Sequence, residues 1–551
     1  MKKLLITIYV TSFVALLFAV PMSPALESTL RTEGTLNTTI EILQEAKRKG
    51  VDAPNPNPVR FERGERVTLQ AIAILVDFDD NVGTTPVSHY DSLLSSLATY
   101  PSGSFRDFYL ENSYNNVDLI ITVVGWLRMP ETYAYYVDGQ YGFGSYPRNA
   151  QRLAEDAVWA ADPQVDFSQF DNDSNGVIDA LFIVHAGPGA EQSGDPNDIW
   201  SHAWVTNNVP YVDSVYAYPY STEPENGRIG VFCHEAGHAV FGLPDLYDYD
   251  YDSYGVGRWS LMAGGSWNGS PGGTSPAHLD AWCKIQAGFV TPQIPTSNQT
   301  GVIFPRVEDN QVIYKLWTSG APGQQFFLVE NRQKTGFDYY LPGSGLMIYH
   351  VDEAQSGNNY QWYPGHTTSG HYLVAVEQAD GLWELEKNIN AGNAGDPYPG
   401  SSNNRALNDT TVPDSKDYNF NTTYVAVENI SDSGDTMTAD IRVTTIGVEE
   451  VSQSYAQGLA LRIAPSIGRR AFTISFGTML DQIELNIKIF DALGRQVKSF
   501  SDVNSETSLT WHADNDKGEM APPGVYFVQL TTRPEDDTAI KAKTHKIILL
   551  K

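Results

Sequence analysis

The pattern of hydrophobic and polar residues predicts both helices and strands up to about residue 290 and mainly strands after it. Apolar, partly β-branched runs at residues 67–78 and 180–185 are typical of buried strands. Helical spacing of apolar residues at 104–111 and 147–161 predicts helices. We therefore expect residues 68–290 to form one α+β domain.

From about residue 291 the helical pattern disappears. Strand-like runs at 326–330, 345–351 and 372–376 alternate with clusters of Gly, Pro and Asn. Residues 291–445 are therefore predicted to be a β-rich domain.

Two polar residues stand on one face of the second of these strands. His350 and Asp352 are two positions apart, and side chains at that spacing point to the same face. They predict either a hydrogen-bonded structural pair or part of a substrate or ion site, and we favour the pair.

The last hundred or so residues carry a third pattern. Residues 483–489 alternate between apolar and polar, 491–495 form a turn, and 525–530 are again strand-like. Several short strands joined by turns predict that residues 446–551 form a small immunoglobulin-like β-sandwich.

The N-terminus has the features of an export signal. Lys2 and Lys3 precede an apolar run over residues 4–20, and Ser23-Pro24-Ala25 offers a small-residue cleavage site. A membrane anchor is the alternative, but the run is shorter than the about 20 residues that a spanning helix needs. We predict a signal peptide at 1–25 and no transmembrane anchor in the mature chain.

The net charge of the chain limits the classes of molecule that we expect it to bind. The chain has 36 Lys and Arg against 66 Asp and Glu, which gives a formal charge of −30. Such a chain repels phosphate backbones, so nucleic acid is excluded as an expected partner. The acidity suits divalent cations, although it also serves simply to keep an exported protein soluble.

Only two cysteines are present, which excludes a disulfide scaffold. Cys233 precedes the motif described next, and Cys283 lies on a helix expected at 276–286. In an oxidising compartment the two could form a bridge, or they could be buried thiols. We favour the bridge.

The strongest chemical signal is His234-Glu235-Ala236-Gly237-His238, an H-E-x-x-H motif between apolar residues. On a helix, positions i and i+4 share one face, so both imidazoles can bind one Zn²⁺. Glu235 between them can act as general base on a metal-bound water. A pair of satisfied core histidines is the alternative.

The residues after the motif predict a chain reversal that returns a ligand to the metal. Gly242 and Pro244 end the helix, and Asp245 is the first following residue with metal-binding chemistry. Asp245 is therefore the expected third zinc ligand. A backbone-bonding turn role for Asp245, Asp248 as the ligand, and a remote Glu remain open alternatives.

A short apolar run at residues 259–267, with Met262 at its centre and a Gly-Gly turn, completes a metzincin-like order of elements. Together with residues 234–248, this run resembles the immune inhibitor A family of secreted bacterial metallopeptidases. Short segments between residues 330 and 381 resemble the same family. The family reads H-E-x-x-H-x-x-G-L-P-D, whereas here three residues separate His238 from Gly242.

The resemblance implies a metzincin-like fold, with the active-site helix under a twisted sheet whose edge strand binds an extended peptide. It also implies zinc as cofactor and proteins as substrates. The predicted function is that of a secreted zinc endopeptidase acting on extracellular proteins. The alternatives are an inactive surface adhesin on a peptidase fold and a zinc hydrolase of non-protein amides.

A second metal signal lies upstream of the motif. Residues 171–179 place oxygen ligands at alternate positions, with Gly at the sixth, as in the first part of an EF-hand loop. The terminal Glu of a true EF-hand is missing, because position twelve is Phe182. We expect a structural Ca²⁺ loop that leads into a strand, with an Asp/Asn-rich turn without an ion as the alternative. The expected calcium ligands are Asp171, Asp173, Asn175, Val177 through its carbonyl, and Asp179.

The C-terminal part carries a second resemblance. The elements Asp491-Ala-Leu-Gly-Arg495 and Gly524-Val-Tyr-Phe527 resemble the C-terminal sorting domains of bacterial type-nine secretion. The resemblance implies recognition by that secretion machinery, an extracellular location and attachment to the cell surface. A spacer or binding module is the alternative.

Residues 26–67 remain. They are polar, with a short helix expected at 38–49 followed by Asn-Pro repeats. We interpret them as a pro-segment or linker, in which no residue stands out as one that would block a zinc site.

Overall fold

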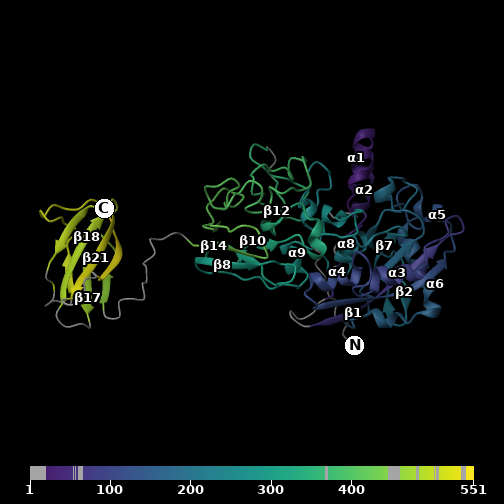
Figure 1. Ribbon diagram of the computed structural model, residues 1–551, viewed down its shortest axis with the longest axis horizontal. Helices are drawn as coiled ribbons and strands as arrows, with labels where there is room; N and C mark the ends of the chain where they lie inside the picture. Colours follow the sequence, from purple (N-terminus) through teal and green to yellow (C-terminus); the bar gives the residue numbers. More distant parts are fainter. Residues whose placement is uncertain are drawn as a thin grey trace, which may run out of the picture. The chain divides into compact units, whose positions relative to one another are not determined.

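The computed structural model is of mixed α+β class and divides into two compact units, residues 1–444 and 445–551 (Figure 1). The described residues are 20–53, 55, 58–59, 66–366, 370–444, 459–478, 483–501, 503, 508–534 and 541–551. Most of the predicted signal peptide, residues 1–19, lies outside them. No helix of the described residues is long and apolar enough to cross a membrane.

A five-stranded sheet lies at the centre of the N-terminal part of the first unit, up to about residue 290. Its strands, in spatial order, are β2 (Val117–Arg128), β1 (Val67–Asp77), β3 (Leu181–His185), β7 (Pro219–Pro224) and β4 (His202–Val205). All neighbours are parallel except β4, which runs antiparallel to β7. β4 is therefore an antiparallel edge strand.

Helices pack on this sheet, and their caps set where each begins. α4 (Phe105–Asn112) follows Ser104, which forms a capping box with Asp107. α6 (Ala150–Ala161) begins at Ala150 and not at the expected residue 147, because the Asn149 side chain caps it. α9 (Ala281–Gln286) likewise starts later than predicted, after its N-cap Asp280.

The helix that carries the H-E-x-x-H motif is α8 (Ile229–Ala239). It packs against β7 and against the edge strand β4. The motif is thus placed beside the open edge of the sheet.

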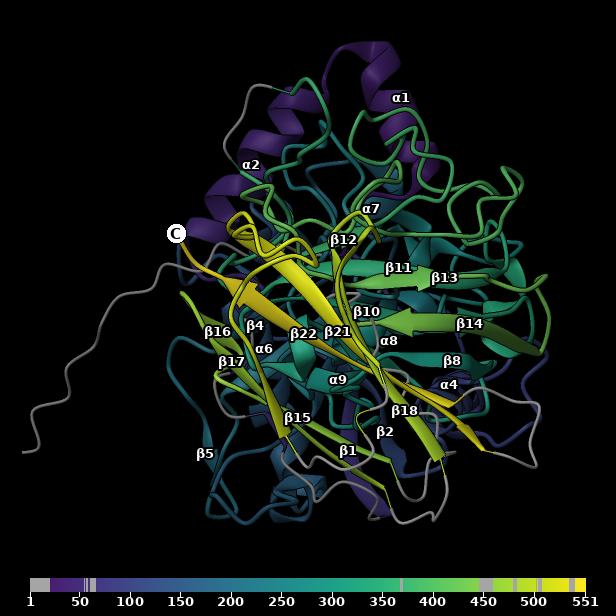
Figure 2. The same cartoon turned by 90° about the vertical axis from the view of Figure 1, so that its left-hand side faces the viewer.

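The N-terminal segment forms two helices, α1 (Pro24–Glu33) and α2 (Leu36–Arg48), at one end of the unit (Figures 1 and 2). The residues just before α1 are buried: Trp200 donates to the Val20 carbonyl and Trp267 to the Pro21 carbonyl, at 3.0 and 2.7 Å. The predicted cut after Ala25 therefore falls inside the first turn of α1.

Residues 291–444 form the β-rich part of the first unit. One sheet has the order β12 (Val374–Val376), β11 (Gly345–Asp352), β10 (Gln325–Arg332), β9 (Tyr314–Leu316). A second has the order β13 (Ala426–Glu428), β14 (Thr436–Arg442), β8 (Gln299–Pro305).

Strands β10 and β11 connect the β-rich part to the part of the first unit that contains the five-stranded sheet. Leu328 and Tyr349 on one face belong to the same core as the central sheet and α8. Phe327 and Ile348 on the opposite face belong to a core shared with β8 and β14. Because alternate residues face opposite sides of a strand, these two strands are buried on both faces and tie the regions together.

A buried ion-pair network reinforces this junction. Arg332 at the end of β10 donates two hydrogen bonds of 2.7 Å to Asp338 and one of 3.0 Å to the Trp259 carbonyl. Arg332 and Asp338 are both fully buried. The bidentate pair with Asp338 holds the guanidinium in place, and its bond to the Trp259 carbonyl links the β-rich part to the run that contains Met262.

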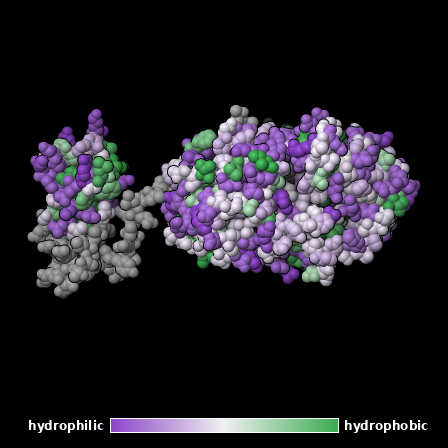
Figure 3. All heavy atoms as spheres, turned by 45° about the horizontal axis from the view of Figure 1, so that its top comes forward, coloured by the Kyte–Doolittle hydropathy of each residue, from purple (hydrophilic) through white to green (hydrophobic). Residues whose placement is uncertain are grey.

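The first unit also contains short elements. They are α3 (Val87–Tyr90), α5 (Tyr133–Val137), α7 (Ala190–Ser193), β5 (Tyr211–Val212), β6 (Val215–Tyr216), a π-turn at Asp91–Ser95 and 3₁₀ turns at Asp162–Gln164, Phe167–Phe170, Gly257–Trp259, Gly264–Trp267, Thr318–Gly320 and Gly336–Tyr340. On the face drawn in Figure 3, apolar residues form small patches separated by polar ones.

The second unit consists of two sheets around one apolar core that includes Trp511 and Val528. One sheet has the order β15 (Leu459–Ala464), β17 (Phe472–Thr478), β20 (Ser508–Trp511). The other has the order β16 (Ile467–Gly468), β22 (Lys541–Leu549), β21 (Gly524–Pro534), β18 (Ile483–Asp491), β19 (Gln496–Phe500).

Candidate active site

The helix α8 is buried along its whole length, which explains its apolar sequence. A Cβ atom placed on Gly237 would lie 2.5 Å from the sulfur of Met262. Only glycine therefore lets Met262 lie directly against the helix between the two histidines. The Met262 backbone carbonyl also accepts a hydrogen bond of 2.7 Å from the amide of Leu246.

Backbone carbonyls fix both imidazole rings. His234 Nδ1 lies 2.9 Å from the Leu261 oxygen, and His238 Nδ1 lies 2.7 Å from the Leu243 oxygen. A carbonyl can only accept, so each Nδ1 carries the proton and each Nε2 presents a lone pair. The two Nε2 atoms are 3.2 Å apart.

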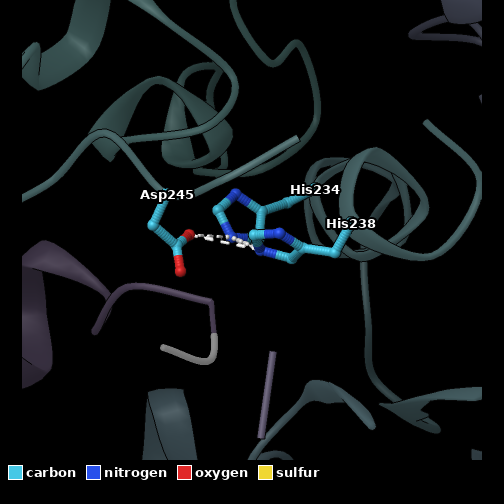
Figure 4. A group of neighbouring side chains, drawn as sticks. All are labelled: His234, His238 and Asp245. Carbon is cyan, nitrogen blue, oxygen red and sulfur yellow. Dashed lines mark hydrogen bonds and ion pairs between the residues drawn. The ribbon is translucent and has the colours of Figure 1, made fainter. Parts of the chain in front are cut away.

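Asp245 completes the cluster (Figure 4). Its Oδ1 lies 3.0 Å from His234 Nε2 and 3.2 Å from His238 Nε2, and all three side chains are fully buried. The structure thus brings together His234, His238 and Asp245.

Three residues separate His238 from Gly242, one more than in the family pattern, and the turn after the helix accommodates the extra residue. Gly242 adopts a left-handed φ of 64° and donates 3.1 Å to the His238 carbonyl, while Leu243 donates 2.9 Å to the Gly237 carbonyl. Asp248 instead accepts from Ser253 and from the amide of Asp250.

The donor set fits a metal ion. Three acceptor atoms face one another at 3.0–3.2 Å. That arrangement is repulsive unless a cation lies among them. A tetrahedral ion with bonds of about 2.0–2.1 Å would place its ligand atoms about 3.3 Å apart. Two neutral imidazoles and one carboxylate match the chemistry of zinc.

Glu235 lies between the two histidine ligands in sequence and is fully buried. Neither of its carboxylate oxygens has a hydrogen-bond partner among the described residues. Burial raises the pKa of Glu235, and the nearby carboxylates of Asp52 and Glu223 raise it further. A buried carboxyl with an elevated pKa is suited to taking up and releasing a proton.

Asp52, Asn55 and Val59 also reach this site, although no motif in the sequence marks them. The Asp52 amide donates 2.6 Å to the Ala203 carbonyl on β4, and the Ala203 amide donates back to the Asp52 carboxylate. Asn55 donates 2.8 Å to the Ala239 carbonyl, and Val59 donates 3.1 Å to the Val240 carbonyl. This segment therefore lies along the edge strand and the end of α8.

Asp52 is fully buried, and its second carboxylate oxygen has no hydrogen-bond partner among the described residues. A cavity of about 340 Å³ adjoins the segment, with His238, Ala203 and Tyr220 in its wall. Glu223 on β7 is the second acid that sequence reasoning missed. Both are single carboxylates outside any motif, so only the fold brings them to Glu235.

The expected disulfide is wrong. Cys233 and Cys283 are both free and buried in the same apolar core. Burial raises the pKa of each thiol, so both are unreactive packing residues.

The upstream acidic loop brings three of its predicted ligands together. Carboxylate oxygens of Asp171, Asp173 and Asp179 lie within 4.8 Å of one another. Asn175 instead accepts 2.8 Å from the Val177 amide through its side-chain oxygen. The strand β3 begins at Leu181, as expected for a loop that leads into a strand.

The expected pair of His350 and Asp352 is not formed. His350 Nδ1 lies 3.4 Å from Glu377, and Asp352 lies 2.7 Å from His371. Both are on β11, away from the residues of the metal cluster in sequence.

Comparison with known proteins finds similarity to one family of peptidases over part of the chain. Residues 59–288 match the family model "Immune inhibitor A peptidase M6, catalytic domain". Immune inhibitor A of Bacillus thuringiensis subsp. alesti is 36% identical over 206 residues, which are 31% of this chain and 30% of that protein. Pre-pro-metalloprotease PrtV of Vibrio cholerae serotype O1 is 32% identical over 274 residues, which are 40% of this chain and 30% of that protein.

The chain thus spans about a third of the length of these curated relatives. Among solved structures, latent PorU from Porphyromonas gingivalis is similar at 15% identity with a TM-score of 0.15, covering 23% of this chain and 12% of PorU. A score that low supports no argument about fold or function.

Proposed function

We propose that this chain, whose residues 59–288 form a peptidase M6 catalytic domain of the immune inhibitor A family, is a secreted zinc-dependent endopeptidase. It would hydrolyse peptide bonds in extracellular proteins. The observation that carries the proposal is the convergence of His234, His238 and Asp245 beside the unpartnered carboxylate of Glu235.

In the proposed mechanism, the zinc ion and the side chains of this chain have different roles. When bound, zinc would polarise the scissile carbonyl and lower the pKa of a water molecule toward about 7. Glu235 would take the proton of that water and deliver it to the leaving nitrogen. Leu261 and Leu243 would keep the histidines oriented as neutral ligands. The Met262 run beneath α8 supports a metzincin-like arrangement.

Substrate would bind along the edge strand β4. The amide and carbonyl of Ala203 point outward from the sheet, since both bond to Asp52. An extended peptide can add to such an edge through main-chain hydrogen bonds, which suits protein substrates of varied sequence.

The contacts of residues 50–59 support the interpretation of the N-terminal segment as a pro-segment. Asp52 uses the same Ala203 groups that a substrate strand would use. Asn55 and Val59 bind the carbonyls at the end of α8. With this segment in place, access to the metal cluster along β4 is blocked and the enzyme would be latent.

The acidic loop at residues 171–179 would hold a structural calcium ion. Asp171, Asp173 and Asp179 converge, and like charges at this spacing favour a bound divalent cation. The loop precedes β3 in the central sheet, so the ion would stiffen the sheet beside the site.

The second unit would serve secretion. Its two sheets around one core are compatible with an immunoglobulin-like sorting domain that bacterial secretion machinery recognises. In this proposal the protein is exported and displayed outside the cell.

Replacing Glu235 by Gln should leave zinc binding intact but lower the rate of casein digestion by about 10²–10⁴-fold, because the proton acceptor is lost. Removing the metal with a chelator should abolish digestion by the unaltered enzyme. Both rates are measured on enzyme freed of residues 20–59. Normal digestion by Glu235→Gln would contradict the mechanism, and no digestion of casein by any form would favour an adhesin or a non-protein amidase.

Metal analysis of the purified protein should count about one zinc and about one calcium per chain. Asp245→Ala should lose zinc and keep calcium, whereas Asp173→Ala should lose calcium and keep zinc. Asp248→Ala is the matched control, because its carboxylate lies outside the cluster, and it should keep both ions. Loss of zinc from Asp248→Ala with retention in Asp245→Ala would overturn the ligand assignment.

Replacing Asp52 by Ala should make the uncleaved chain roughly tenfold more active on casein, because a buried hydrogen bond that holds the segment on β4 is lost. Glu45→Ala on α2 is the control, since Glu45 pairs only with exposed Arg48, and it should leave the chain latent. Equal activity of Asp52→Ala and the unaltered uncleaved chain would count against latency through this segment.

Deleting residues 446–551 should retain the protein inside the producing cell, while its casein activity in a lysate after removal of residues 20–59 persists. Fractionation and immunoblotting measure the distribution. Export of the shortened chain at the normal level would show that the second unit is not a sorting domain.

A further inference from the structure

The β-rich part of the first unit contains a second cavity, of about 280 Å³. Within the described part of the chain, its wall is formed by residues between 350 and 420 and shares no residue with the metal cluster. The volume is near the lower end of the about 300–1,000 Å³ typical of small-molecule sites. It can therefore take one small group.

One ring nitrogen of a buried histidine in the wall lacks a hydrogen-bond partner among the described residues. His350 is 3% exposed, and its Nε2 has no hydrogen-bond partner among the described residues. Its Nδ1 lies 3.4 Å from the Glu377 carboxyl group, so an ionised Glu377, paired with a bound cation, requires the proton on Nδ1. Nε2 then carries a lone pair, and a ligand that satisfies it must bring a hydrogen-bond donor.

The His350 ring is held in place by stacking. Phe327 lies 4.3 Å away and Tyr418 lies 4.1 Å away, measured between ring centroids. Tyr418 is in turn stacked on His371 at 3.6 Å. The acceptor on His350 is thus preorganised and cannot turn to find a protein partner.

Among the described residues, neither Glu377 nor Glu386 in the wall forms an ion pair with a lysine or an arginine. Burial raises the pKa of Glu377 to about 8, and burial likewise raises the pKa of Glu386 to about 8. Lys416 also lines the cavity, but its ammonium pairs with Asp414 at 2.9 Å. A positively charged ligand would therefore be the natural counter-ion for Glu377 and Glu386.

Aromatic rings supply a further part of the wall, which includes Trp362, Trp383 and Phe420. The face of an aromatic ring attracts cations and packs against an alkyl chain. An anion would meet carboxylates here, and a ligand without donors would leave His350 unsatisfied. The combined chemistry selects a cation that bears N–H groups on an apolar stem.

We propose that this cavity binds the guanidinium or ammonium end of an arginine- or lysine-like ligand, with His350 and Glu377 as its hydrogen-bond acceptors. The ligand is a side chain of a bound protein or a free alkyl cation. The site stands apart from the proposed peptidase activity, and its test does not depend on catalysis.

The test is calorimetric titration of the full chain with butylguanidinium and with butylurea, its uncharged isostere. Butylguanidinium should bind saturably, and butylurea should bind at least about tenfold more weakly because it carries no charge. Glu377→Gln should weaken butylguanidinium binding at least about tenfold. Asp409→Asn is the control, since it removes an exposed carboxylate close to the wall in sequence, and it should bind normally.

Trp383→Leu tests the aromatic part of the wall and should also weaken binding of the cation, while equal melting temperatures establish that the variants are folded. Tighter binding of N-acetylarginine amide than of butylguanidinium would assign the ligand to a protein side chain, and weaker binding would assign it to a free cation. Equal binding of butylurea, tighter binding of a neutral sugar such as glucose, or unchanged affinity in Glu377→Gln would overturn the proposal.

Discussion

The site depends on three hydrogen-bond acceptors that the fold forces to face one another. The Leu261 and Leu243 carbonyls hold the protons of His234 and His238 on the far side of each ring. Both lone pairs therefore point at the Asp245 carboxylate. Burial of α8 on all sides prevents the rings from turning to solvent, so a cation is the natural partner for the cluster.

The residues around the cluster hold the two histidine rings and Asp245 in this arrangement. Gly237 leaves room for Met262, and the run that holds Met262 also supplies the Leu261 carbonyl. Arg332 binds the Trp259 carbonyl at the start of that run. Strands β10 and β11, buried on both faces, connect this anchor to the β-rich part. The β-rich part is therefore a support for the metal cluster as well as a region with a cavity of its own.

The sequence predicted those features that depend on local periodicity. The α+β class, the helix with the motif and the buried strands at 67–78 and 180–185 could be predicted from the spacing of apolar residues along short segments. The beginnings of α6 and α9 were missed by a few residues, because Asn149 and Asp280 act as caps.

Features that depend on contacts between distant segments could not be predicted. Asp52 reaches Ala203 across about 150 residues, and no motif marks it. The bridge between Cys233 and Cys283 was expected from compartment and number alone, yet both are packed as apolar side chains. His350 pairs with Glu377, the residue after β12, and not with its own strand neighbour Asp352, because pairing across strands depends on the sheet register.

The most direct test of the central claim is an anomalous-diffraction map of crystals of the full chain, recorded on both sides of the zinc absorption edge. The account predicts one edge-dependent peak about 2.0–2.2 Å from Nε2 of His234, Nε2 of His238 and a carboxylate oxygen of Asp245. No such peak at full zinc loading, or a peak bound by a different set of side chains, would contradict it.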